Sequence, residues 1–273
     1  MKKHIRKFIS IIMVGMFVVL SMGQINVKAA PQGTTASNPI KLAFGEWHKT
    51  SWTWETEDRN CYNLVNVRKT GYITIKIKKP YDSYGDYGKL NIAVYKKSNN
   101  AELYTTDTVE SVDDGSEFYT YKVGVTKGQY IVRFKPDFSV YEGRIYTSYK
   151  VDFKSNKYTI TLPRRADSKS IALNKKYTGF FGSGFESSSE KEQCIRVKLK
   201  KGKRYKIEYH AYGDRGSTIF EMINPSGSVN WKFDDNYTIN RIKIKKTGIY
   251  TFKMYNYLGA QYRYTFKVKR IKK

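Results

Sequence analysis

The sequence predicts an all-β protein built from two tandem jelly-roll-like antiparallel β-sandwich domains. The first observation is that turn signals recur about every 8–12 residues along the chain. The second is that Lys or Arg alternates with Val, Ile, Tyr, Phe or Thr in the short runs between those turns. The third is that the runs recur in the same order in the second half of the chain. Such alternation places one row of side chains in a core and the other row in water.

The expected strands are short, and no segment shows a sustained helical period. In the first half they are YITIKIK (72–78), LNIAVY (90–95), YTYKVGV (119–125), YIVRFK (130–135) and SYKVDF (148–153). In the second half they are IRVKLK (195–200), YKIEY (205–209), TIFEMI (218–223), RIKIKK (241–246), IYTFKMY (249–255) and YRYTFKV (262–268). Their enrichment in β-branched and aromatic residues favours strands.

The two halves align as copies of one unit. CYNLVNVRKTGYITIKI (61–77) resembles CIRVKLKKGKRYKIEY (194–209), and the opening IKLAFGEWHKT (40–50) resembles IALNKKYTGFF (171–181). A YGDxG turn follows in each half, YGDYG (84–88) and YGDRG (212–216), where glycine and aspartate favour a chain reversal. We therefore expect a tandem duplication. Its parts are an N-terminal linker (30–37), a first sandwich (38–154), a linker (155–168) and a second sandwich (169–273).

The N-terminal 29 residues have the composition of a bacterial signal peptide. A basic segment, MKKHIRK, precedes the apolar run FISIIMVGMFVVLSMG, and Val27 and Ala29 are the small residues expected before a cleavage site. The alternative is an uncleaved anchor, and no later segment resembles a membrane span. We expect a secreted protein that is released or held non-covalently at the cell envelope.

The chain is strongly basic, with a formal net charge of +26. Removal of residues 1–29 would remove five basic residues (Lys2, Lys3, Arg6, Lys7 and Lys28) and no acid, leaving 26 − 5 = +21. This charge predicts attraction to an anionic cell-wall polymer, a glycan or a matrix protein; unspecific retention at the wall is the alternative. The lysines alternate along nearly every strand instead of lining a groove, so we expect no specific nucleic-acid binding.

Several motifs of the second half resemble the bacterial pre-peptidase C-terminal (PPC) domain. They are KKGKRYKIEY, TIFEMINPSG, FDD and KKTGIYTFKMYN, and the first half is a looser copy that has YKKSNN in place of INPSG. The resemblance covers nearly all of the chain after the signal. It implies a jelly-roll-like accessory module without catalytic activity, distantly similar to the collagen-binding modules of clostridial collagenases. Some relatives use calcium, but no acidic cluster precedes the first unit, so we expect no cofactor.

Catalytic signals are weak. His48 and His210 occupy non-corresponding places, and the acid pairs 113–114 and 234–235 are typical of turns. Cys61 and Cys194 appear at matching positions of the two copies, which favours core residues; they form either one disulfide or two buried thiols. No metal-binding or phosphate-binding motif is present. We expect no enzyme, with a secreted hydrolase of unfamiliar site as an alternative.

Two aromatic clusters are the candidate ligand-binding residues. GEWHKTSWTWETED (45–58) contains Trp47, Trp52 and Trp54, and the loop region that follows the strand at 72–78 contains Tyr81, Tyr84 and Tyr87. Exposed rings can stack on sugars or contact a protein. The sequence therefore predicts a non-catalytic binding or adhesion module with an exposed aromatic patch that includes Trp52 or Trp54. In the alternatives, the rings fill the end of the sandwich, or the pair of domains docks onto a secreted peptidase.

Overall fold

The computed structural model describes residues 33–53, 60–81, 89–98, 101–105, 117–137, 144–161, 168–181, 192–212, 218–234, 237–256 and 262–271. The chain groups into two compact units, Met1–Pro31 and Gln32–Lys273, and the first lies wholly outside the described residues. All regular elements in the described ranges are β-strands. A search of those ranges for a helix able to span a membrane found none.

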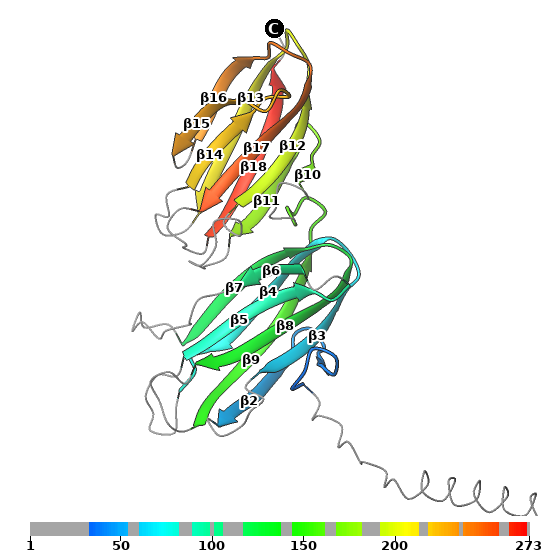
Figure 1. The fold of residues 1–273 in the computed structure, drawn as a ribbon, viewed down its shortest axis with the longest axis vertical. Helices are drawn as coiled ribbons and strands as arrows, with labels where there is room; N and C mark the ends of the chain where they lie inside the picture. The colour runs from blue at the N-terminus through cyan, green and yellow to red at the C-terminus, as the bar shows by residue number, and fades with distance from the viewer. Residues whose placement is uncertain are drawn as a thin grey trace, which may run out of the picture. The chain divides into compact units, whose positions relative to one another are not determined.

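The first sandwich consists of two sheets (Figure 1). One has the order β1 (Ile40–Lys41), β3 (Cys61–Val67), β8 (Gly128–Asp137), β5 (Lys89–Lys96) and β6 (Ala101–Thr105). The other has the order β2 (Trp47–Thr53), β9 (Arg144–Ser155), β4 (Gly71–Lys78) and β7 (Phe118–Val125). All neighbouring strands are antiparallel except β1 and β3, which are parallel.

The second sandwich repeats this strand order. One sheet is β10 (Lys169–Ser170), β12 (Glu192–Leu199), β17 (Gly248–Asn256), β14 (Thr218–Ile223) and β15 (Val229–Asp234). The other is β11 (Lys176–Phe181), β18 (Tyr262–Ile271), β13 (Arg204–Tyr212) and β16 (Tyr237–Lys243). The β10–β12 pair is again parallel. The fold class, two tandem jelly-roll-like antiparallel β-sandwiches, is confirmed; the residue boundaries of the domains stay a prediction.

Each sandwich has its own core between its two sheets. In β4, Ile73, Ile75 and Ile77 are fully buried, whereas the residues between them reach the outside of the sheet. The first core is mainly aliphatic, while the second is built from aromatic rings such as Phe220, Phe252 and Phe266, whose centroids lie 5.1–5.8 Å apart. Both cores are formed by the inward side chains of alternating strands, so we looked for function on the outer faces and ends.

The strand registers correct the alignment of the two halves. Val67 of β3 pairs with Gly128, the first residue of β8, and Leu199 of β12 pairs with Gly248, the first residue of β17. Val67 therefore corresponds to Leu199, and counting back along the strands makes Asn63 correspond to Ile195. Cys61 therefore corresponds to Gln193, not to Cys194, and the expectation that the two cysteines occupy matching positions is wrong. Similar composition at the start of β3 and β12 concealed this one-residue shift.

Four buried tyrosines bind the turn that precedes their own strand. The Tyr130 hydroxyl accepts a hydrogen bond from the Thr126 amide (3.0 Å) and donates one to the Thr126 carbonyl oxygen (3.0 Å). The Tyr250 hydroxyl donates to the Lys246 carbonyl oxygen at 2.9 Å. The remaining two bonds run from Ala172 N to Tyr177 Oη and from Lys200 N to Tyr205 Oη, each 3.1 Å. These bonds explain why tyrosine so often follows the Lys-Gly-type turns.

Removal of the Tyr130 hydroxyl should destabilise the protein more than removal of the Tyr250 hydroxyl. Tyr130→Phe leaves both backbone groups of Thr126 without their partner, at a cost of about 1–3 kcal/mol, whereas Tyr250→Phe leaves one carbonyl, at about 1 kcal/mol. Urea unfolding measures both, with Tyr81→Phe as the control because Tyr81 is 45% exposed. Equal midpoints for all three variants would contradict the role of these bonds.

Candidate functional site

The candidate site is the outer face of the sheet β2-β9-β4-β7, hereafter the outer face. Along β2, His48, Thr50 and Trp52 point toward the core, so Trp47 points outward. The same alternation puts Lys150 of β9 and Lys76 of β4 on this face, where Trp47 pairs with Lys150 and Lys150 pairs with Lys76. One row of side chains thus crosses three strands of the sheet.

Aromatic rings and ammonium groups alternate at the centre of the outer face. The Trp47 ring is 46% exposed, and its centroid lies 5.5 Å from that of Phe118. Lys76 Nζ lies 4.0 Å from the Phe118 ring centroid, and Lys150 Nζ lies 5.7 Å from the Trp47 ring centroid. Both ammonium groups are thus within cation–π range, which holds the long side chains beside the rings. The arrangement offers an apolar ring face with positive charge on both sides.

A second aromatic pair extends the outer face. Tyr81, 45% exposed, stacks on Tyr146 of β9 with ring centroids 5.4 Å apart and an interplanar angle of 20°. The two residues also exchange both backbone hydrogen bonds, at 3.1 and 2.8 Å. Tyr146 and Lys150 point to the same side of β9 and are four residues apart, a separation of about 13 Å. Two aromatic sites along one strand suit an extended ligand better than a small one.

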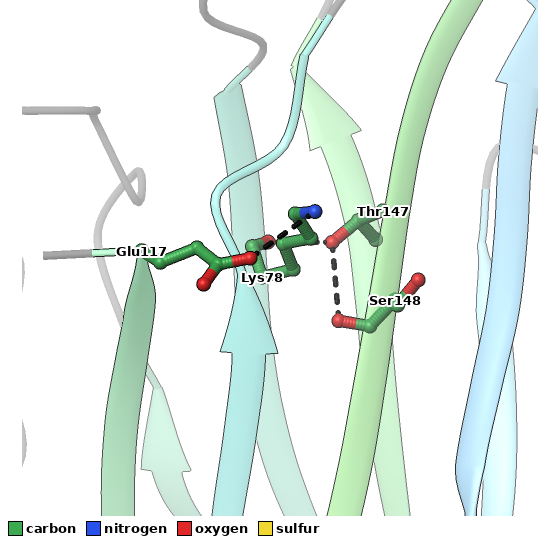
Figure 2. A network of polar contacts seen from close by, with 4 residues as sticks. All are labelled: Lys78, Glu117, Thr147 and Ser148. Carbon is green, nitrogen blue, oxygen red and sulfur yellow. Dashed lines mark hydrogen bonds and ion pairs between the residues drawn. The ribbon is translucent and has the colours of Figure 1, made fainter.

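A polar network joins the end of β4 to β9 and to Glu117, beside the first residue of β7 (Figure 2). The Thr147 hydroxyl donates to the Lys78 carbonyl oxygen at 2.7 Å, and Lys78 Nζ forms an ion pair with Glu117 Oε1 at 3.2 Å. Thr147 is buried, so its hydroxyl needs this internal acceptor. The chain then leaves β4 through Lys79 and Pro80 and pairs with β9 again at Tyr81.

The outer face is positively charged. Its two acids, Asp152 and Glu117, are each paired with a lysine, Asp152 with Lys150 at 3.2 Å and Glu117 with Lys78 at 3.2 Å. Further basic residues point outward from the same strands, namely Lys49, Lys76, Lys122 and Arg144. These exposed ion pairs add little to stability. Among the described residues of this face the basic side chains outnumber the two acids, which leaves a positive potential over the aromatic rings.

The structure separates the six aromatic residues that the sequence singled out. Trp47 and Tyr81 are exposed on the first sandwich. Trp52 is 5% exposed and belongs to the core, so the expectation that it forms part of an exposed patch is wrong: it shares the inward side of β2 with His48. Trp54, Tyr84 and Tyr87 lie outside the described residues.

Sequence reasoning missed Phe118, Lys76, Lys150 and Tyr146, which contribute to the site. Each is an ordinary outward position of a predicted strand or lies beside one. Their proximity to Trp47 and Tyr81 depends on which strands are neighbours, and the only available signal was an aromatic residue in an outward strand position.

The inner cluster near Cys61 does not resemble a nucleophilic site. Burial raises the pKa of the Cys61 thiol, although hydrogen bonds with Tyr149, Asn63 and Thr50 oppose the shift. Tyr149 donates to Asn63 Oδ1 at 2.7 Å and lies 3.7 Å from Cys61 Sγ. His48 stacks on Tyr149, and its buried Nε2 has no hydrogen-bond partner in the described part of the chain.

The other catalytic candidates give no assembled site in the described ranges. His210 lies exposed on β13 beside Glu208, whose pKa is lowered mainly by its hydrogen bond with Lys206, so this acid is a paired surface carboxylate. The acid pair 113–114 and Asp235 lie outside the described residues. Among those described, no group of three or more His, Cys, Asp or Glu side chains could hold a metal ion.

Both cysteines should behave as buried, unreactive thiols. Cys61 and Cys194 are free and are 7% and 0% exposed. Because the raised pKa of Cys61 lowers its thiolate fraction at pH 8, a thiol reagent should label neither residue in the native protein and both after unfolding. Rapid labelling of one thiol in the native protein at pH 7 would contradict this reading, and failure to label either after unfolding would indicate a disulfide.

No family model matches the chain, and no curated protein matches it. Among solved structures, the pre-peptidase C-terminal domain of collagenase from Bacillus anthracis is 12% identical, over 42% of this chain and 94% of that domain, with a TM-score of 0.32. The N-terminal CBM22-1–CBM22-2 tandem domain of Xyn10C from Paenibacillus barcinonensis is 9% identical, over 85% of this chain and 93% of that one, with a TM-score of 0.28. The CUB1-EGF-CUB2 domain of human MASP-1/3 is 12% identical, over 81% and 99%, with a TM-score of 0.23. The fold class rests on the strand order given above.

Proposed function

We propose that this protein is a secreted, non-catalytic binding module that holds an anionic extracellular glycan, such as a cell-wall polymer, on the outer face. The observation that carries the proposal is the exposed Trp47 ring beside Phe118, with Lys76 and Lys150 in cation–π contact. A flat ring can stack on the C–H face of a sugar, while the flanking ammonium groups attract its carboxylates or phosphates.

Charge and shape contribute differently to this binding. The net charge, 26 − 5 = +21 without residues 1–29, attracts any polyanion from a distance, and this contribution weakens as salt screens it. Contact with the rings of Trp47 and Tyr81 persists at high salt and provides selectivity. Trp47 pairs with Lys150 and Tyr81 pairs with Tyr146, and these two positions of β9 lie about 13 Å apart, which favours a polymer that touches both aromatic sites at once.

The remaining parts of the proposal follow from the sequence. Residues 1–29 direct export, and the pair of sandwiches, with boundaries 38–154 and 169–273, descends from a duplicated PPC-like unit. The protein stays at the envelope through its charge. If the pair of sandwiches instead docks onto a secreted peptidase, the protein should bind that peptidase and not a polymer.

Trp47→Ala should weaken binding to one polymer about tenfold at high salt, equivalent to about 1.4 kcal/mol. The measurement is co-sedimentation of the chain without residues 1–29 with cell wall, with teichoic-acid-free wall, and with cellulose, chitin and collagen, each at low and high salt. Ile249→Ala is the control, because Ile249 is an exposed apolar residue of the second sandwich (53%).

The salt arm separates the alternatives. Binding that survives high salt in the wild type and the Ile249→Ala variant, but not in Trp47→Ala, supports the proposal. The proposal would be contradicted if the protein bound every anionic polymer at low salt, lost this binding at high salt, and showed no difference between Trp47→Ala and wild type. Binding would then depend on net charge only. Collagen retention that depends on Trp47 would replace the glycan with a matrix protein.

A further inference from the structure

A pocket of about 330 Å³ opens at one end of the second sandwich. It lies between the turn that joins β14 to β15 and the turn that joins β16 to β17. Its size falls at the lower end of the range of about 300–1,000 Å³ that is usual for small-ligand sites. The pocket belongs to the second sandwich, whereas the outer face belongs to the first, so the two sites can be tested separately.

The floor of the pocket is apolar and its walls are polar and basic. Met222, Ile242, Ile244 and Tyr250 form the floor and are each at most 8% exposed. The walls are formed by amide and hydroxyl side chains on one side and by lysines on the other. They come from the first turn (Asn224 and Ser226), from β15 (Asn230), from the end of β16 (Lys243) and from the second turn (Lys245 and Lys246). No acidic side chain is among these lining residues, so the pocket favours an anion.

The wall formed by the β14–β15 turn is fixed in place. Asn224 Oδ1 accepts hydrogen bonds from the Ser226 and Ser228 amides, at 2.8 and 3.1 Å. Gly248 on the opposite turn has no side chain, and a Cβ there would lie 2.5 Å from Pro225 Cγ, so the two turns are packed in direct contact. A wall with these constraints does not have to be ordered when a ligand binds.

Two side chains of the pocket are oriented by hydrogen bonds and still have N–H groups that can donate to a ligand. Asn224 Nδ2 donates to Asn230 Oδ1 at 3.0 Å, which fixes the Asn230 amide plane. The Asn230 Nδ2 group has no acceptor among the described residues and can donate to a ligand. Lys246 Nζ donates one hydrogen bond to Ser226 Oγ at 3.3 Å, which places its charge over the pocket and leaves its other two N–H donors available.

We infer that this pocket binds one anionic sugar unit, a sugar that carries a carboxylate or a phosphate. The apolar floor contacts the C–H face of the ring, Asn230 donates to a hydroxyl group, and Lys246 pairs with the anion. In the first sandwich the strand registers place Lys96 where the second has Asn224. The inference deepens the proposed glycan binding by adding a site for a single unit.

The test is calorimetric titration of the chain without residues 1–29 with glucuronate, glucose 6-phosphate, glucose and inorganic phosphate. We expect saturable binding of glucuronate or glucose 6-phosphate, and binding at least about tenfold weaker for neutral glucose and for phosphate alone. Comparison of glucuronate with glucose 6-phosphate shows whether the pocket prefers a sugar that carries a carboxylate or one that carries a phosphate. Asn230→Ala and Lys246→Ala should each weaken the binding by about tenfold.

A matched control keeps this inference falsifiable. Lys127→Ala removes the same charge from the β7–β8 turn of the first sandwich and should leave the binding unchanged. If none of the four probes binds saturably, or if Lys127→Ala weakens binding as much as Lys246→Ala does, the pocket is not a site. Loss of polymer binding in Trp47→Ala with intact sugar binding would separate the outer face from the pocket.

Discussion

The rest of the structure depends on the burial of alternate side chains along the antiparallel strands. In β4, three isoleucines fill the core and the residues between them must therefore point outward. A shift of one residue in the register would expose the isoleucines and bury lysines, which is energetically prohibitive. This constraint fixes which side chains can form an exposed face, and it places Trp47 outside and Trp52 inside on the same strand.

The same constraint explains how a basic face coexists with aromatic rings. Lysine stems lie along neighbouring rings, as with Lys76 on Phe118, while the ammonium groups remain accessible to solvent and ligand. The rings would be an aggregation hazard on an uncharged sheet. Flanked by lysines, they form the surface on which we propose that an anionic glycan binds. Charge and aromatic contact are thus parts of one surface.

The two sandwiches share a strand order but differ in their details. The tyrosine after the β7–β8 turn and the tyrosine after the β16–β17 turn, Tyr130 and Tyr250, bind their turns in the same way. The neighbouring turns differ, because Pro225 packs against Gly248 in the second sandwich while Gly128 has only distant contacts in the first. A repeated framework with different turns allows each half to present a different surface.

The all-β class and the strands could be predicted from the sequence because two-residue alternation is a local property, and the tandem arrangement because the runs recur in order. The sequence also identified Trp47 and Tyr81. Alternation puts Trp47 and Trp52 on opposite sides of a strand but does not say which side faces the core. The pairing of β2 with β9 in the folded protein settles this, because it turns Trp52 into the core. The tertiary structure also places Phe118, Lys76 and Lys150, from strands distant in sequence, beside Trp47. It shows that Cys61 and Cys194 occupy positions of the two sandwiches that do not correspond. These features depend on strand order and register, which are set by packing between sheets and not by the residues of any one strand.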